Sequence, residues 1–183
     1  MQFRKNFYET LNLRYLKTPI EKSIQIPPSI LVQENESKIF DLGERKIKVT
    51  AYSPAHTNND VTITDIKTGT LWAGDLLFIE RTPVIDGDIH GFIDVLGQLI
   101  SLNDINLVIP GHGTPTRNWQ NAFKKSKDYF ITLRDDIRRS ISEDQGLRKA
   151  IETVAKSESK KWELFDVQNA RNINQVYPKL EWE

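Results

Sequence analysis

Three short apolar segments of this sequence, each typical of a buried β-strand, are followed closely by a side chain that can bind a metal. These side chains are His56, Asp75 and His112, and the segments before them are residues 47–52, 71–73 and 107–109. Open sheets gather their binding sites where strands end and the chain leaves the buried layer. The pattern therefore predicts a sheet with three lone-pair donors near one edge. Gly74 is predicted to end the second of these strands before Asp75.

The wider hydrophobic pattern predicts a mixed α/β fold. Strands are expected at 38–42, 46–52, 61–66, 70–73 and 107–109, with Gly69 in a hairpin turn between the third and fourth. Helical spacing predicts helices at 4–17, 89–102, about 118–142 and about 146–157. The stretch 23–32 is interrupted by two prolines and is expected to be an edge or linker. Four aromatic residues of the tail are expected to pack on the body: Trp162, Phe165, Tyr177 and Trp182.

Size and composition exclude several classes of protein. The chain has 183 residues, with 25 basic and 25 acidic side chains, so nothing favours binding to nucleic acid or to an anionic membrane surface. It has no cysteine, which rules out disulfides and thiolate metal sites. No apolar run approaches the ~20 residues of a membrane span. The first residues do not form a signal peptide, so we expect the chain in the cytoplasm, or in the periplasm if an export signal lies upstream.

His56, Asp75 and His112 are candidate ligands for zinc or a similar ion, because such metals accept imidazole nitrogen and carboxylate oxygen. Each residue alone has an ordinary explanation as a turn cap, a helix cap or part of a tight turn. The set favours metal binding, because all three follow apolar strands and small neighbours let the backbone approach a site closely. Thr57 and Thr114 are candidates for orienting the ligands by hydrogen bonds.

Three motifs resemble the later motifs of the metallo-β-lactamase superfamily: His56-Thr57 followed by Asp60, Gly74-Asp75-Leu76-Leu77-Phe78, and Pro110-Gly111-His112-Gly113. Their order and spacing are most similar to the glyoxalase-like and quinoprotein-associated branches. The resemblance covers about residues 35 to 140. It implies an αββα sandwich, here mainly its C-terminal half (36–142), preceded by a helix and linker (1–35) and followed by a helical extension (143–183).

The resemblance also implies a site and a reaction. His56 would bind a first zinc, His112 a second, and Asp75 would bridge the two, which places Asp75 in the catalytic machinery. The implied activity is hydrolysis of a small ester, thioester or amide-like substrate by a metal-bound hydroxide.

The superfamily's first motif, His-x-His-x-Asp-His, is missing. No histidine precedes His56, and the only other one is His90. Each metal position would have two protein ligands, whereas a catalytic zinc usually has three and a structural zinc four. We therefore expect weak metal binding, no activity by this chain alone, and association with a complementary N-terminal half or with itself. Two alternatives are a non-catalytic binding or scaffold protein of the same fold, and a homodimer that supplies His90 or Asp86 in trans.

Overall fold

The computed structural model describes residues 28–183. The chain divides into two units, Met1–Leu31 and Val32–Glu183, and the second holds every element named below. The predicted helix at 4–17 and most of the predicted stretch at 23–32 lie outside the described residues.

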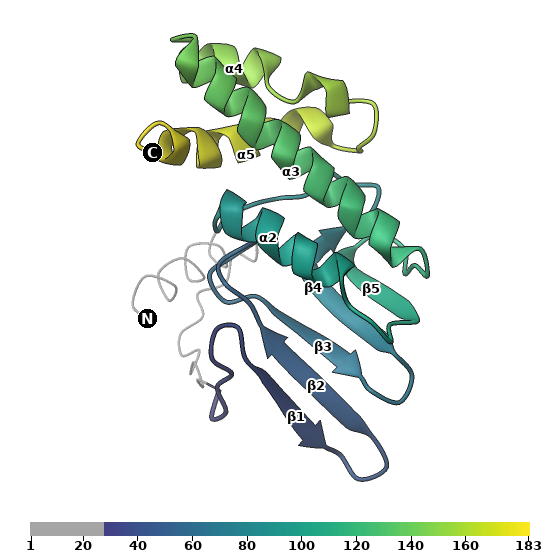
Figure 1. Ribbon diagram of the computed structural model, residues 1–183. Helices are drawn as coiled ribbons and strands as arrows, with labels where there is room; N and C mark the ends of the chain where they lie inside the picture. Colours follow the sequence, from purple (N-terminus) through teal and green to yellow (C-terminus); the bar gives the residue numbers. More distant parts are fainter. Residues whose placement is uncertain (1–27) are drawn as a thin grey trace, which may run out of the picture. The chain divides into compact units, whose positions relative to one another are not determined.

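A five-stranded sheet, with its strands in sequence order, carries the site (Figure 1). Neighbouring strands from β1 to β4 are antiparallel, while β5 runs parallel to β4. A parallel step needs a crossover connection, and α2 supplies it. The elements are β1 Ser37–Asp41, β2 Lys46–Ala51, β3 Val61–Asp65, β4 Thr70–Phe78, α2 Ile89–Ile100, β5 Leu107–His112, α3 Trp119–Ser142, α4 Leu147–Thr153, the short 3-10 helix η1 Lys156–Glu158 and α5 Phe165–Leu180.

The predicted hairpin between β3 and β4 is confirmed, and Asp65 organises its turn. The Lys67 N–H donates to Asp65 Oδ1 at 3.0 Å, and Arg45 forms an ion pair with Oδ2 at 3.0 Å. Gly69 adopts the left-handed conformation (φ 65°) that the turn requires. Burial, the largest influence on the Asp65 carboxyl, raises its pKa, but hydrogen bonds from Thr68 and Lys67 and the charge of Arg45 together hold the pKa below its usual value.

The prediction that Gly74 ends a strand is wrong, because β4 continues to Phe78. Gly74 instead takes a positive φ of 54° in an irregularity where the pairing with β5 shifts register. Such a bulge bends the strand and re-aims the next side chain, which here is Asp75. β5 is also longer than predicted and includes His112, which pairs with Phe78.

The helices α2 and α3 lie along one face of the sheet (Figure 1). Both were predicted, and α2 begins with a side-chain cap: Asp88 accepts a hydrogen bond from the Gly91 N–H at 2.8 Å. Phe92 of α2 and Phe130 of α3 pack with ring centroids 4.4 Å apart, and neither ring is exposed. These contacts form the centre of the core.

The C-terminal region differs from its prediction. The expected helix at 146–157 stops at Thr153, because Ala155 takes a left-handed conformation (φ 56°) before η1. The tail forms α5, a helix that the sequence analysis did not predict, and Figure 1 shows it beside α3 and α4. The other three aromatic residues of the tail are buried as expected, but Trp182 is 88% exposed, so that prediction is wrong.

The face of the sheet opposite the helices carries an apolar row. Val49, Ile63, Trp72 and Ile109 lie directly across from one another on four neighbouring strands. Ile63 and Trp72 are 37% and 43% exposed. We call these four residues the open row. The sequence neighbours Leu71, Ala73 and Val108 point to the other face of the sheet and are buried.

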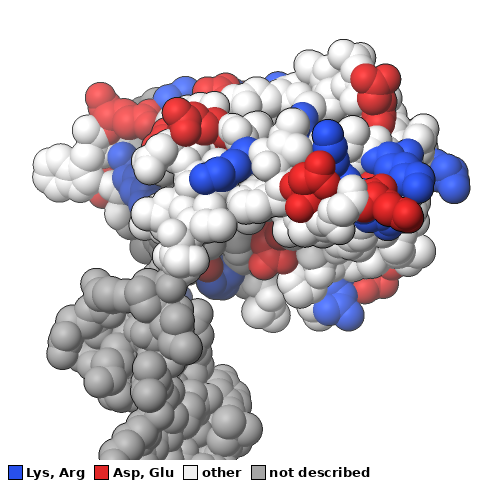
Figure 2. Space-filling view, turned by 90° about the horizontal axis from the view of Figure 1, so that it is seen from below, with Lys and Arg blue, Asp and Glu red and all other residues white. Residues whose placement is uncertain are grey.

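Figure 2 shows Lys and Arg interspersed with Asp and Glu on one face, without a large patch of a single sign. Between residues 28 and 183, none of the helices is both long enough and apolar enough to cross a membrane.

Candidate metal site

The structure brings His56, Asp75 and His112 together. His56 Nε2 lies 3.4 Å from Asp75 Oδ2, and His112 Nε2 lies 3.4 Å from Asp75 Oδ1. The three side chains therefore form a row, with the carboxylate between the imidazoles and each ring facing a different oxygen. Both separations exceed the usual range of a hydrogen bond, about 2.7–3.2 Å for N–H···O.

Two glycines give Asp75 its position. The bulge at Gly74 directs the Asp75 side chain toward Gly111 of β5. A Cβ atom on Gly111 would lie 2.2 Å from Asp75 Oδ1 and 2.7 Å from the Gly74 carbonyl oxygen. Only a residue without a side chain leaves room for the carboxylate at this place.

His112 is held by its stacking on Phe78. The two rings are nearly parallel, with an interplanar angle of 16° and centroids 4.9 Å apart. The Ile79 N–H donates to the His112 carbonyl at 2.9 Å, and Gly113 then turns the chain with a φ of 99°. The stacking restricts the orientation of the imidazole and leaves its Nε2 toward Asp75.

His56 lies in the loop after β2 and is oriented by a backbone carbonyl. Its Nδ1 is 2.7 Å from the carbonyl oxygen of Val84. Because a carbonyl can only accept, Nδ1 carries the hydrogen, which leaves Nε2 with a lone pair in the neutral ring. Metal-binding histidines are commonly held in this way. The prediction for Thr57 is wrong: its hydroxyl donates to Asp60 at 2.7 Å, and among residues 28–183 neither it nor Thr114 bonds to the three candidate ligands.

The donors suit zinc in kind but fall short in number. Two ligand atoms of one tetrahedral zinc lie about 3.3–3.5 Å apart, given bonds of about 2.0–2.2 Å. The separations on either side of Asp75 fit that spacing. However, the row offers two donors at each position, and the described part of the chain contains no group of three or more His, Asp or Glu placed to hold an ion. Each imidazole thus faces one carboxylate oxygen, which gives fewer donors than a zinc ion usually has.

Helix α5 contributes to the same site. A hollow of about 350 Å³ is lined by the row and by Asp86, Gln168 and Arg171. Arg171 forms an ion pair with Asp86 at 2.6 Å. Asp86 was expected near the site only as a residue supplied in trans by a homodimer, and neither α5 side chain was predicted there. His90 is not in this hollow, because it lies in α2 and pairs with Glu183 at 2.7 Å.

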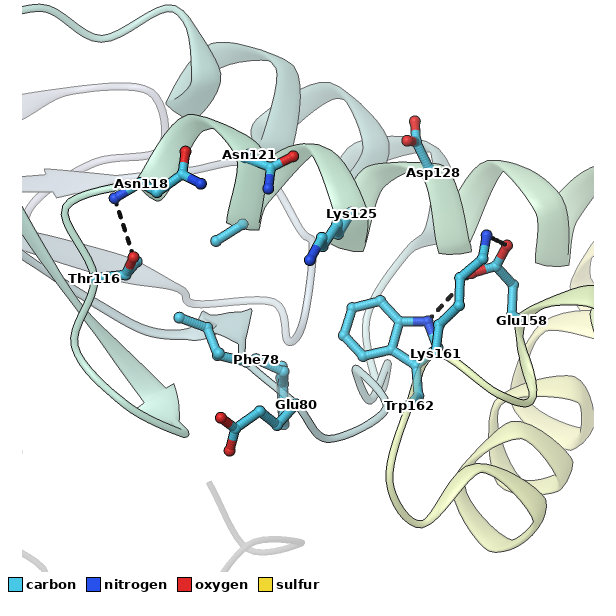
Figure 3. A pocket seen from close by; sticks show the side chains of 12 residues that line it. Phe78, Glu80, Thr116, Asn118, Asn121, Lys125, Asp128, Glu158, Lys161 and Trp162 are labelled. Atoms are coloured by element: carbon cyan, nitrogen blue, oxygen red, sulfur yellow. Dashed lines mark hydrogen bonds and ion pairs between the residues drawn. The ribbon is translucent and has the colours of Figure 1, made fainter.

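A larger hollow of about 650 Å³ shares Phe78 with the site (Figure 3). Asn121 and Lys125 of α3 and its N-cap residue Asn118 line it, and Figure 3 shows Lys125 directed into the space near the indole of Trp162. Within residues 28–183 the side chains of these three residues have no hydrogen-bond or ion-pair partner. The hollow combines apolar rings with free polar donors.

Comparisons with known proteins show which fold this is. No protein-family model and no curated protein matches the sequence. A stereoselective inverting sec-alkylsulfatase from Pseudomonas sp. superposes with a TM-score of 0.70 at 13% identity, over 84% of this chain and 26% of that one. A double mutant of a sec-alkyl sulfatase gives 0.67 at 12% identity, over 83% and 27%. A metallo-β-lactamase family protein from Thermus thermophilus gives 0.52 at 16% identity, over 63% and 39%.

These similarities confirm the predicted metallo-β-lactamase fold. The chain spans about a quarter of the length of the two sulfatase structures. Such partial coverage is consistent with the C-terminal portion that the motifs indicate.

Proposed function

We propose that this chain contributes His56, Asp75 and His112 to the zinc site of a metallo-β-lactamase-fold hydrolase acting on a small ester, thioester or amide-like substrate. The observation that carries the proposal is the Asp75 carboxylate, which presents one oxygen to each imidazole at 3.4 Å. When bound, zinc would lower the pKa of a water and polarise the scissile group. This chain's own residues hold and orient the donors: Val84 and Phe78 fix the two rings, and Gly111 admits the carboxylate.

The remaining ligands would come from a second αβ half that covers the open row. Two observations support this part of the proposal: each metal position would have two donors, and Ile63 and Trp72 of the open row are exposed on the sheet face away from the helices. In a sandwich, that face packs against another sheet. A second copy of this chain would add only the same three histidines, so the heterologous half is the better candidate.

The substrate would lie in the hollow beside Phe78. Asn118, Asn121 and Lys125 provide amide and ammonium donors, while Phe78 and Trp162 provide apolar rings. A small organic anion with an aromatic or alkyl body fits this lining. Benzoate serves as a probe: we expect it to shift the indole N–H resonance of Trp162, and Lys125→Gln to weaken that binding. If Lys125→Gln bound benzoate as tightly as the wild type, the proposal that the hollow binds an anion would be refuted.

Zinc titration of the ¹⁵N-labelled chain tests the metal site. Zinc is expected to shift the Nε2 resonances of His56 and His112 together at millimolar concentration, while His90 serves as the internal control because it pairs with Glu183 outside the site. Asp75→Asn should abolish both shifts, and His90→Gln should leave them unchanged. Binding that follows His90, or that survives Asp75→Asn, would refute the proposed ligands.

A non-catalytic binding protein of the same fold is the second candidate. It is favoured by the absence of any histidine before His56 and by the two donors at each position. It predicts that His56→Ala and Asp75→Asn leave the biological activity of the protein intact, whereas the hydrolase proposal predicts loss of activity in both.

A further inference from the structure

The carbonyl that orients His56 is itself held by a buried side chain from the far end of the chain. Asn172 of α5 lies against the residues on either side of Val84. Its Oδ1 accepts a hydrogen bond from the Ile85 N–H at 3.2 Å, and its Nδ2 donates to the Pro83 carbonyl at 2.7 Å. The carboxamide therefore brackets Val84 and determines the direction of its carbonyl.

These two hydrogen bonds belong to a longer buried network. The second hydrogen of Asn172 Nδ2 goes to the Tyr129 hydroxyl at 2.9 Å, and that hydroxyl donates to Asn169 Oδ1 at 3.0 Å. Asn169 Nδ2 in turn donates to the Val154 carbonyl at 3.0 Å. Because the Ile85 N–H can only donate and the carbonyl of Val154 can only accept, the direction of every bond between them is fixed.

Burial makes the network costly to disturb. Asn172 and Tyr129 are fully buried and Asn169 is 1% exposed, so an unpaired group here would have no water to bond instead. Burial also raises the pKa of the Tyr129 phenol well above its usual value, which keeps the hydroxyl protonated and able to donate. Both hydrogens of Asn172 Nδ2 and its oxygen are used, so the carboxamide has one orientation.

Further contacts from α5 hold the same loop. Gln175 Nε2 donates to the Asp86 carbonyl at 3.0 Å, and Lys179 Nζ donates to the Gly87 carbonyl at 2.5 Å. The Asp86 and Gly87 N–H groups donate in turn to the carbonyl of His56 at 2.8 and 2.7 Å. The loop is thus anchored to α5 on one side and to the His56 backbone on the other.

We propose that Asn172 is a positioning residue for the metal site. By holding the Val84 carbonyl, it fixes His56 in the tautomer that carries its hydrogen on Nδ1. The lone pair of Nε2 then faces Asp75. The role in metal binding rests on the proposed function, whereas the tautomer of His56 does not depend on a metal. Residues that orient a ligand from behind typically change metal affinity by about 10–100-fold when lost.

The test is the ¹⁵N spectrum of the three imidazoles at about pH 8, where an ordinary imidazole is neutral. In the wild-type chain, His56 should show a protonated Nδ1 and an unprotonated Nε2. Asn172→Leu, which removes all three bonds at similar size, should give a mixture of the two tautomers, and zinc-induced shifts of His56 should then need an about 10–100-fold higher metal concentration. Tyr129→Phe is the matched control, because it removes a hydroxyl from the network but leaves both bonds that bracket Val84.

The outcomes separate this inference from the proposed function. A wild-type His56 protonated on Nε2, or an Asn172→Leu variant that keeps the wild-type tautomer, overturns the positioning role. If Asn172→Leu does not fold, exchange of the His56 Nδ1 hydrogen with solvent can be measured in the wild-type chain. Slow exchange supports the hydrogen bond to the Val84 carbonyl, and fast exchange overturns it. If zinc fails to bind while the tautomers behave as described, the hydrolase proposal fails and the role of Asn172 stands.

Discussion

Substituting Gly111 by alanine should displace the Asp75 carboxylate from between the two imidazoles. A Cβ atom at this position would lie 2.2 Å from Asp75 Oδ1, and such atoms do not approach other heavy atoms closer than about 3.0 Å. The carboxylate must therefore retreat by at least about 0.8 Å. It is the easier group to move, because the other close neighbour is the backbone of Gly74, at 2.7 Å. The backbone of Gly111 itself does not have the positive φ that disfavours alanine, so the effect is steric.

The expected magnitudes follow from that displacement. Ligand positions need to be kept within about 0.5 Å, so a shift of this size should weaken zinc binding about 10–100-fold. Crowding the strand should also lower the free energy of unfolding by about 1–3 kcal/mol. The binding loss should affect His56 and His112 together, since the carboxylate lies between them.

Zinc titration followed by the imidazole ¹⁵N shifts measures the binding, and urea denaturation measures the stability. Gly146→Ala is the matched control, because a Cβ atom there meets nothing within 4 Å and the residue precedes α4, away from the site. Zinc binding by Gly111→Ala equal to that of the Gly146→Ala control would refute the reasoning, even if stability fell as expected.

Three further predictions follow from the fold. Asp65→Asn should lower the free energy of unfolding above about pH 4, because the folded-state pKa of Asp65 lies below its unfolded value. The difference between wild type and variant should shrink as the pH falls through the folded-state pKa. Urea denaturation at several pH values measures this difference. Phe92→Ala should lower the free energy of unfolding by about 3–5 kcal/mol in the same assay, since the buried ring packs on Phe130. Trp72→Lys should reduce any self-association in analytical ultracentrifugation while changing the free energy of unfolding by no more than about 0.5 kcal/mol. Unchanged association would show that copies of this chain do not associate through the open row.

Much of the fold could be predicted because its strands and the helices α2 and α3 follow simple periods. The α2 helix combines a continuous apolar face with an aspartate cap, and the β3–β4 hairpin has glycine where a positive φ is required. Gly74 misled the prediction, since a glycine inside a strand marks either an end or a bulge, and sequence alone does not distinguish them. Here the strand resumes and its continuation carries Asp75 and Phe78.

Helix α5 was missed because two of its buried positions are asparagines. Phe165, Asn169, Asn172, Val176 and Leu180 lie on one helical stripe, but an apolar pattern skips the two polar members. They are buried because Tyr129 and backbone groups satisfy their amides, a pairing that only the tertiary structure reveals. Pro178 in the last turn further weakens the helical signal.

The three candidate ligands could be predicted from the local sequence, but the groups that support them could not. The sequence placed His56, Asp75 and His112 after strands, and the structure brings them together; that they bind metal stays a prediction. The supporting groups came from elsewhere: a backbone carbonyl at Val84, which has no sequence signature, and Arg171 from α5.

A crystal structure of the chain grown with zinc, with anomalous scattering measured at the zinc edge, tests the central claim most directly. We expect anomalous peaks beside Asp75, with one zinc reached by His56 Nε2 and a second by His112 Nε2, each at about 2.0–2.2 Å from its protein ligands. Zinc bound at His90 alone, or imidazoles at 56 and 112 turned away from the carboxylate, would contradict the account.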